Sequence, residues 1–262
     1  MREKPLFPPL TGKPRLSYSR LLVFLWCGVR YRFQYLERVA WRTTLAIARG
    51  AGVDEAAARD LRERCRLRLP ELVEIAVATY EGELAESETS ESKLELAAGK
   101  DSTADAARTY GLCVSPKTPN PALVQEPIVA DLGEIELAGV PDYAVEVGGV
   151  QSPLDLKVGR ERTQSDARRS RQLTGNGLLV RARTGGLPEH VGFDSIFQVR
   201  GRWLHKRVWA ERKTVDYVGL INTLKAAQGG IDAGVFLPAP EGAWWCSAKW
   251  CPFHGECEFA QK

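Results

Sequence analysis

GVPDYAVEVGGVQSPLDLKVGR, residues 139–160, is the stretch on which the interpretation of this chain depends. Two runs rich in β-branched and apolar residues, 143–147 and 154–158, lie within it. The Gly148–Gly149 pair between them is typical of the turn that joins neighbouring strands. The stretch therefore predicts two strands of a sheet with a short connection between them.

Three charged side chains accompany these two strands. Asp142 lies at the end of the strand expected before the first of these two, and Asp155 and Lys157 lie two residues apart on the second. Because residues i and i+2 of a strand share a face, Asp155 and Lys157 can point into one cleft. If the hairpin also brings Asp142 alongside, two carboxylates and one ammonium group converge. The alternative interpretation is an exposed strand face that carries an ordinary ion pair.

Such a group has the composition of a site for metal-assisted phosphodiester hydrolysis. Carboxylate oxygens are hard ligands suited to Mg²⁺ or Mn²⁺, and a magnesium site usually keeps water positions that a phosphate can enter. A lysine beside the metal can orient or help deprotonate the attacking water, and it can stabilise the charge that develops on the phosphate. Each of the three residues therefore has a distinct expected task.

The remainder of the chain alternates between helical and strand-like patterns. Ser17 or Ser19 can cap an early helix, and later helices are expected at residues 53–67, 70–85, 101–110, 166–183 and 215–227. Further strands are expected at residues 123–130, 135–140, 191–199 and 206–209. Residues 87–100 and 115–121 are expected to be surface connections. We therefore expect an α/β fold in which helices flank a central mixed sheet.

Size and composition constrain the class of protein. With 262 residues, of which 44% are hydrophobic, the chain can bury the core of one large domain. A formal net charge of +3 does not by itself indicate a nucleic-acid partner. The proline-rich start lacks the apolar core of a signal peptide, and the apolar residues 21–29 are too few to cross a bilayer. We expect a cytoplasmic protein with no membrane partner.

The order of the motifs resembles that of RecB-like nucleases of the PD-(D/E)XK class. A G-x-x-D motif ends at Asp142, a D-x-K motif spans Asp155, Leu156 and Lys157, and Gln172 begins a partial Q-x-x-x-Y motif. The resemblance implies a restriction-endonuclease-like core in which Asp142, Asp155 and the backbone carbonyl of Leu156 bind the metal. It also implies that Lys157 is the catalytic lysine and that Gln172 steadies the site or the DNA.

Two positions depart from the pattern of that family. The tyrosine that usually closes the Q-x-x-x-Y motif falls at Asn176. The early helix often supplies a histidine ligand, whereas the best-matching position here holds Asp54, a residue that can also bind metal. Glu126 is either a further acid near the metal or an ordinary glutamate on an edge strand.

Basic residues crowd the segment that follows the D-x-K motif. Residues 157–183 contain eight lysines and arginines against two acids. On one continuous helix, Arg168 and Arg169 would lie four and three residues before Gln172, on or beside the face that looks into the cleft. Together with Arg171 they are expected to contact DNA phosphates, the alternative being a solvated helix face.

Three cysteines lie close together near the end of the chain. Four residues separate Cys246 from Cys251, and five separate Cys251 from Cys257. In a reducing compartment such thiols are more often metal ligands than disulfide partners. A zinc ion or a four-iron cluster needs a fourth ligand. From spacing alone, a zinc knuckle in which His254 is that ligand remains an alternative.

The sequence SYSRLLVFLWC at residues 17–27 resembles the start of a subset of these nucleases, among them phage exonucleases and CRISPR-adaptation nucleases. Their members have one cysteine on an early helix and three near the C-terminus, and they carry a 4Fe–4S cluster. The resemblance therefore implies such a cluster, joining the two ends of the chain, on Cys27, Cys246, Cys251 and Cys257. Many members have two residues between the first two late cysteines, whereas this chain has four.

The two resemblances together imply a single nuclease domain over residues 1–262. Its parts would be a mainly helical part (1–115), a nuclease core (121–235) and a cysteine cluster segment (240–262). The expected activity is that of a metal-dependent DNA exonuclease, acting on DNA with single-stranded character in recombination, repair or phage DNA processing. The alternatives are a DNA-end-trimming endonuclease that acts with an integrase or recombinase, and a catalytically inactive iron–sulfur DNA-binding subunit.

Overall fold

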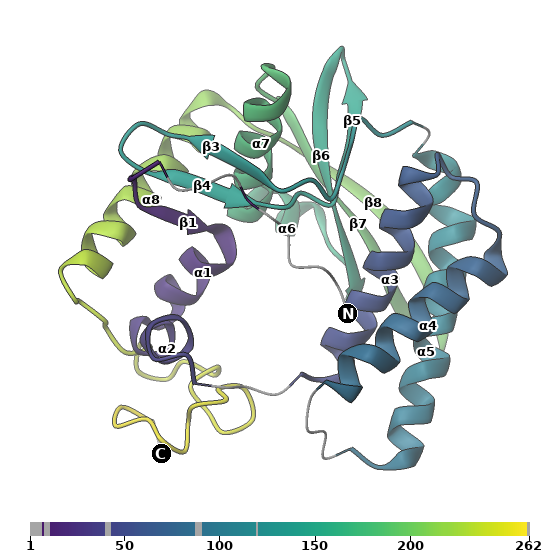
Figure 1. Cartoon of the computed structure of the whole chain (residues 1–262), viewed down its shortest axis with the longest axis horizontal. Coiled ribbons are helices and arrows are strands. Elements are labelled where there is room, and N and C mark those ends of the chain that lie inside the picture. The colour runs from purple at the N-terminus through teal and green to yellow at the C-terminus, as the bar shows by residue number, and fades with distance from the viewer. Residues whose placement is uncertain (1–6, 8–10, 40–42, 87–90, 119, 261–262) are drawn as a thin grey trace.

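Two β-sheets organise the computed structural model of the chain, which describes residues 7, 11–39, 43–86, 91–118 and 120–260 (Figure 1). The larger sheet has the strand order β2 (Leu123–Val124), β5 (Tyr143–Val147), β6 (Val150–Gly159), β7 (His190–Val199) and β8 (Arg202–Glu211). The smaller sheet has the order β1 (Arg15–Ser17), β4 (Glu136–Gly139) and β3 (Ile128–Asp131). The β6–β7 and β1–β4 pairs are parallel and the other pairs antiparallel, so both sheets are mixed. The α/β architecture expected from the sequence is confirmed.

Helices flank the larger sheet on both faces. The described helices are α1 (Tyr18–Trp26), α2 (Gly28–Tyr31), η1 (Arg32–Leu36), α3 (Leu45–Arg62), α4 (Leu69–Ala85), α5 (Lys93–Cys113), η2 (Ser115–Lys117), α6 (Gln164–Arg169), α7 (Arg171–Thr184) and α8 (Thr214–Asp232). Helices α3, α4 and α5 form a layer beside β6, β7 and β8 (Figure 1). None of the helices in these ranges is long and apolar enough to span a bilayer.

Helix α7 lies between the two sheets, in contact with β6 and β7 on one side and with β3 and β4 on the other. This position explains why residues 173–180 are all buried and why this part of the helix has no solvent-exposed face. Gly177 permits the close approach of α8, because a β-carbon at that position would lie 2.6 Å from the hydroxyl oxygen of Tyr217. The helix therefore holds its first turn in a fixed place relative to β6.

The β5–β6 hairpin forms as its sequence predicts. Gly148 and Gly149 form its turn with φ angles of 60° and 80°, a conformation that glycine adopts without strain. Leu154 and Leu156 pack into the core under α3, α4 and α5. Because side chains alternate along a strand, Asp155 and Lys157 face the opposite side, toward α6 and α7.

Several expected boundaries were wrong. The strand expected over residues 123–130 is two short strands, β2 and β3, which belong to different sheets. Residues 87–100 do not form a surface connection throughout, since α5 begins at Lys93, and α3 begins at Leu45 rather than at residue 53. Ser92 and Glu95 form a capping box, in which the Ser92 hydroxyl accepts from the Glu95 N–H at 3.3 Å and the Glu95 carboxylate accepts from the Ser92 N–H at 2.8 Å. The acidic composition of this stretch concealed that helix start.

The helix expected over residues 166–183 is two helices, which meet at Ser170. The backbone of Ser170 is extended, and its hydroxyl accepts a hydrogen bond from the Leu173 N–H at 3.2 Å. The buried Arg212 secures the break, because its guanidinium donates to the Ala167 and Ser170 carbonyl oxygens at 2.7 and 2.9 Å. The residue that follows β8 thus adds hydrogen bonds to two carbonyls at the break between the helices.

Candidate functional site

The open end of the β5–β6 hairpin brings Asp142 and Asp155 together. The strand register pairs Tyr143 with Leu154, so the next position outward places Asp142 opposite Asp155. One carboxylate oxygen of Asp142 accepts a hydrogen bond from the Leu156 N–H at 2.6 Å. The loop residue that precedes β5 is therefore held against the middle of the D-x-K motif.

Asp155 is the most enclosed group of the site, with 1% of its surface exposed. Its Oδ1 accepts a hydrogen bond from the Gln172 side-chain amide at 2.7 Å, and its Oδ2 lies 2.5 Å from the ammonium nitrogen of Lys157. The side chain of Lys157 is 28% exposed, so its head group remains accessible from outside. The structure thus brings together all four side chains that the sequence proposed as catalytic, namely Asp142, Asp155, Lys157 and Gln172.

The charges of these groups act strongly on one another. Burial raises the pKa of Asp142 well above its ordinary value, and the negative charges of Asp155 and Asp54 act in the same direction. Burial opposes the charged form of Lys157, but the carboxylates of Asp155 and Asp142 outweigh it and raise the pKa of the lysine. Three acids therefore crowd a site that contains one ammonium group, and they repel one another unless further positive charge is present.

These residues fit a divalent cation with oxygen ligands. Asp155 Oδ2 is fully buried and, apart from its ion pair with Lys157, has no hydrogen-bond partner among the described residues. Over the same residues no three histidine, cysteine, aspartate or glutamate side chains form a ready metal-binding group. Magnesium is commonly held by one or two carboxylates and several waters, so two carboxylates are a sufficient protein contribution.

Asp54 reaches the site from helix α3. Its charge contributes to the raised pKa of Asp142, which places the two carboxylates near one another. The backbone carbonyl of Asp54 lies 3.5 Å from the side-chain amide nitrogen of Gln125, and the Gln125 N–H donates to the Asp142 carbonyl at 2.9 Å. Gln125 therefore ties α3 to the loop that carries Asp142, and the sequence analysis did not foresee this connection.

The arginines proposed to bind DNA have a different arrangement from the one expected. Arg168, Arg169 and Arg171 are all exposed, as contact with a ligand requires. The break at Ser170, however, puts Arg168 and Arg169 on α6 and Gln172 on α7. The predicted alignment of Arg168 and Arg169 with Gln172 on one helix face was therefore wrong.

Arg162 is a further basic group close to the site. Its guanidinium lies over the Phe193 ring, with 5.5 Å between the guanidinium carbon and the ring centroid. Its Nε is buried and lacks a hydrogen-bond partner in the part of the chain that the structure describes. Burial lowers its pKa, while the nearby Asp155 favours its charged form. The sequence analysis counted Arg162 only as one member of the basic run.

Tyr18, the first residue of α1, also lies beside the site. Its Cβ would be 3.9 Å from a β-carbon placed on Gly175 of α7. Burial raises the pKa of its hydroxyl, and the charges of Arg171, Asp155 and Lys157 also act on it. No local pattern could have revealed this aromatic hydroxyl, because Tyr18 is distant in sequence from every motif of the site.

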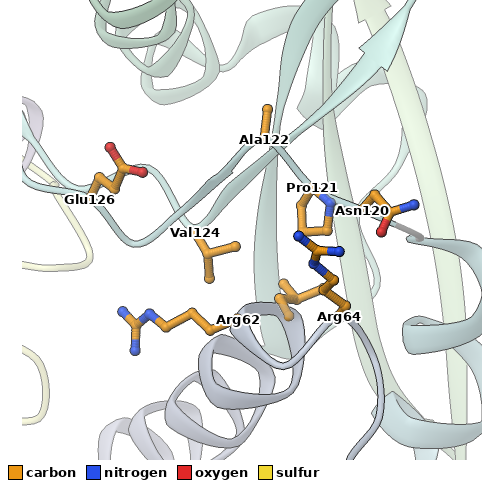
Figure 2. Close-up of a pocket in the computed structure, with 8 residues that line it drawn as sticks. Arg62, Arg64, Asn120, Pro121, Ala122, Val124 and Glu126 are labelled. Atoms are coloured by element: carbon orange, nitrogen blue, oxygen red, sulfur yellow. The ribbon is translucent and has the colours of Figure 1, made fainter.

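The two departures from the motif pattern, and the nearby Glu126, have clear positions. Asn176, which occupies the tyrosine position, is 8% exposed within α7. Glu126 forms an ion pair with Arg183 at 3.1 Å, as a surface glutamate would, and it lines a pocket beside the end of α3 (Figure 2). Asp54 is close to the carboxylates, as described above.

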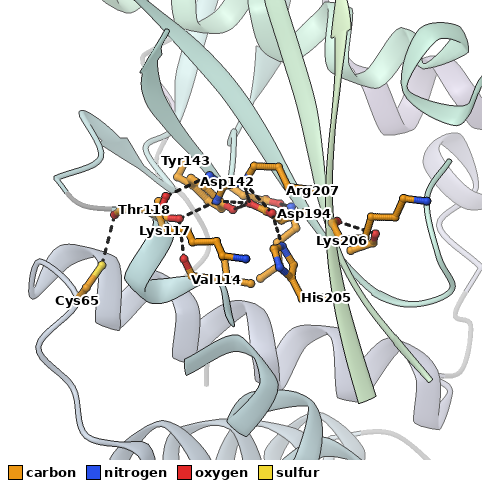
Figure 3. Close-up of polar contacts among 12 residues, drawn as sticks. Cys65, Val114, Lys117, Thr118, Asp142, Tyr143, Asp194, His205, Lys206 and Arg207 are labelled. Atoms are coloured by element: carbon orange, nitrogen blue, oxygen red, sulfur yellow. Dashed lines mark hydrogen bonds and ion pairs between the residues drawn. The ribbon is translucent and has the colours of Figure 1, made fainter. Parts of the chain in front are cut away.

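A buried polar network lies on the opposite face of the larger sheet. Asp194 is fully buried and accepts hydrogen bonds from the Tyr143 hydroxyl and, at 2.8 to 3.0 Å, from the Arg207 guanidinium (Figure 3). A ring nitrogen of His205 lies 2.6 Å from the same carboxylate. Arg207 Nη2 also donates to the Thr118 hydroxyl at 2.8 Å. Phe193, the neighbour of Asp194, faces α6 and α7. The network therefore lies on the face of the sheet opposite the carboxylates.

The four cysteines proposed as cluster ligands lie where α1 and α2 come beside the C-terminal segment of the described chain (Figure 1). The Gly28 N–H donates to the Leu237 carbonyl at 2.7 Å, Trp26 stacks on Trp245 with ring centroids 5.8 Å apart, and Phe33 stacks on Phe253 at 5.5 Å. Aromatic packing therefore joins the early helices to the cysteine-rich segment.

All four of these cysteines are half-buried free thiols. Cys27 lies between α1 and α2, and its sulfur accepts a hydrogen bond from the Arg30 N–H at 3.3 Å. Burial raises the pKa of Cys251, and Cys27 and Cys246 are near enough to act in the same direction. Cys27, Cys246 and Cys251 are thus neighbours, but within the described ranges no three of the four thiols are arranged as a metal-binding group.

Comparisons with known proteins agree with this architecture. Residues 15–258 match the family model described as the PD-(D/E)XK nuclease superfamily, whereas no curated protein matches the chain significantly. A crystal structure from Eubacterium rectale, described as a "putative exonuclease", has 13% sequence identity and a TM-score of 0.54, covering 92% of this chain and 93% of that one. The crystal structure of SSO0001 has 9% identity and a TM-score of 0.42, covering 97% and 90%. The likeness to the Eubacterium rectale structure shows a shared fold.

Proposed function

Because the chain belongs to the PD-(D/E)XK nuclease superfamily, we propose that it is a metal-dependent DNA exonuclease that hydrolyses phosphodiester bonds. The convergence of Asp142, Asp155 and Lys157 at one end of the β5–β6 hairpin is the observation that carries this proposal. Exonuclease activity in particular is supported by the RecB-like motif order. The description of the Eubacterium rectale structure points the same way, although its likeness to this chain extends only to the fold.

Magnesium or manganese would be held by Asp142, Asp155 and the backbone carbonyl of Leu156, with Asp54 as a further carboxylate. When bound, the ion would polarise the scissile phosphate and lower the pKa of an attacking water. The mutual repulsion of the acids supports this assignment, because a bound cation relieves it.

The protein's own side chains have separate tasks in this proposal. The Lys157 ammonium orients the attacking water and stabilises the negative charge that develops on the phosphate oxygens. The Gln172 amide fixes the direction of the Asp155 carboxylate through their 2.7 Å hydrogen bond. The guanidinium of Arg162, held over the Phe193 ring, would offer positive charge to a phosphate at the edge of the site.

We propose that Arg168, Arg169 and Arg171 contact the DNA backbone, because all three are exposed on the two helices that meet beside Gln172. Backbone contacts of this kind carry no sequence information. Their removal should weaken binding to all sequences alike and reduce the dependence of affinity on salt.

We also propose that Cys27, Cys246, Cys251 and Cys257 hold a 4Fe–4S cluster with a structural task. The closeness of Cys27 and Cys246 to Cys251 supports this assignment, as does the packing of α1 and α2 against the cysteine-rich segment. Four thiolates are the donor set that such a cluster requires. Zinc, with His254 as one ligand, is the alternative occupant.

The function is tested by digesting end-labelled single- and double-stranded DNA, and a closed circular plasmid, in the presence of magnesium. We expect wild-type protein to shorten the linear substrates from an end and to leave the closed circle intact. Asp155→Ala should abolish this activity, whereas Asp131→Ala, which removes an exposed aspartate paired with Lys13, should retain it. Cleavage of the closed circle would indicate internal, endonucleolytic cutting and contradict the exonuclease. Release of short oligonucleotides from the linear ends alone would indicate an end-trimming endonuclease, and binding without cleavage would indicate an inactive DNA-binding subunit.

A further inference from the structure

A pocket lined by two arginines lies at the end of helix α3, outside the carboxylate site. The pocket, of about 530 Å³, opens between the end of α3 and residues 120–126, and Arg62 and Arg64 contribute to its wall (Figure 2). Leu61 and Val124 add apolar surface to the same wall. The volume is within the range of pockets that bind small ligands or single groups of a larger one.

The charge of this pocket is positive. Arg62 and Arg64 are exposed, and among the described residues neither forms a hydrogen bond or an ion pair through its side chain. The acidic group in the wall is Glu126, which is already paired with Arg183 at 3.1 Å. Two guanidinium groups therefore face solvent without a neutralising partner, and guanidinium matches the geometry of phosphate oxygens.

The pocket shares a wall with the carboxylate site. Val124 and Glu126 line the pocket, and Gln125 between them donates through its backbone N–H to the Asp142 carbonyl at 2.9 Å. Along α3, Arg62 follows Asp54 by eight residues, which corresponds to about 12 Å at 1.5 Å per residue. A strand whose scissile phosphate lies at the carboxylates is therefore within reach of both arginines.

Three residues around this wall have unusual backbone conformations. Arg64, Asn120 and Gln125 adopt φ angles of 57°, 53° and 46°, in the left-handed region that residues with side chains rarely occupy. Such conformations are concentrated at functional sites. Two of these residues, Arg64 and Asn120, line the pocket. The third, Gln125, connects the wall to the Asp142 carbonyl.

We propose that this pocket binds backbone phosphates of the DNA strand that leads away from the scissile bond, with Arg62 and Arg64 as the phosphate-binding residues. The inference rests on the nuclease function proposed above and extends its substrate path beyond the carboxylates. None of the residues that line the pocket is aromatic, so it offers no surface on which bases stack. Recognition is therefore electrostatic and independent of sequence.

The test is the salt dependence of DNA affinity. Anisotropy of a labelled single-stranded oligonucleotide is measured with EDTA, which prevents cleavage, for wild type and for the Arg62→Ala, Arg64→Ala double variant. We expect roughly tenfold weaker binding at low salt and a salt slope reduced by about 0.7 for each lost contact. Arg62→Lys with Arg64→Lys keeps both charges and should keep most of the slope.

Arg202→Ala is the matched control, because it removes an exposed arginine from β8, at the opposite edge of the larger sheet. A double alanine variant with wild-type affinity and slope, while wild type still cleaves DNA, would overturn the pocket assignment and leave the proposed function standing. An equal loss of slope in Arg202→Ala would also overturn it, since the effect would then reflect total charge. Wild-type protein that neither binds nor cleaves DNA would overturn both.

Discussion

The Leu156 amide nitrogen lies 2.6 Å from a carboxylate oxygen of Asp142, across the open end of the β5–β6 hairpin. This hydrogen bond directs a loop carboxylate toward the strand that carries Asp155 and Lys157. The remaining oxygen of Asp142 is then free to turn toward a ligand. Two acids from different segments thus become one site because a single backbone N–H holds the first of them.

Lys157→Ala should lower the rate of DNA cleavage by about 10²–10³-fold, because it removes a positive charge aimed at the phosphate. DNA affinity should change little, since the proposed function assigns most of the contacts to the DNA backbone to the exposed arginines. Rates and affinities are compared with those of Lys225→Ala, which removes a lysine of α8 that is paired with Glu134. A Lys157→Ala variant with an unchanged cleavage rate would contradict the assigned task.

Gln172→Ala should weaken metal binding by about 10- to 100-fold, because the amide that orients Asp155 is lost. Cleavage should recover when the magnesium or manganese concentration is raised, so a metal titration distinguishes an orienting task from a direct one. Gln164→Ala, which removes a hydrogen bond to the Trp209 carbonyl on the same side of the sheet, is the control. A rate defect that no metal concentration restores would exclude the orienting task.

Cys27→Ala should lower both the iron content and the melting temperature of protein purified without oxygen, because cluster binding contributes to folding free energy. The wild-type protein should be brown. Cys65→Ala, which removes a half-buried thiol that contacts the Thr118 carbonyl, should keep the colour. Colourless wild-type protein with stoichiometric zinc would refute the cluster. A Cys27→Ala variant with full iron content would instead make His254 the residue to test.

Asp194→Asn should destabilise the protein by about 3–5 kcal/mol at neutral pH, because it breaks a buried network of charged groups. Burial acts to raise the pKa of Asp194, but hydrogen bonds from His205 and Arg207 and the charge of Arg207 hold it below its ordinary value. A carboxylate with a lowered pKa stabilises the folded state above its unfolded pKa, about 3.9, and this contribution is lost as the pH falls through the folded pKa.

The difference in unfolding free energy between wild type and Asp194→Asn should therefore be constant from neutral pH down to about pH 4 and shrink below it. Urea unfolding across that range measures the difference. Asp131→Asn, at an exposed ion pair, should show little difference at any pH. A constant difference at all pH values would show that Asp194 does not act through its charge.

Much of the site was predictable because its signals are local. The run of β-prone residues, the two glycines and the i, i+2 spacing of Asp155 and Lys157 depend on residues within one hairpin. Gln172 followed from motif order and lies 2.7 Å from Asp155 in the structure. The assignment of the cysteines as ligands and of the arginines as DNA contacts stays a prediction.

Other features depended on contacts between distant parts of the chain. Arg212 secures the helix break at Ser170 across 42 residues, and Tyr18 reaches α7 from the first helix. Helix propensity at residues 166–183 cannot reveal a break that a remote guanidinium stabilises. The sequence by itself determined the hairpin, the D-x-K motif and the fold class, because backbone preference and side-chain alternation act over a few residues. Only the tertiary structure decided which further remote groups, Tyr18 and Gln125 among them, adjoin the site, because packing and electrostatic forces act through space and leave no local pattern.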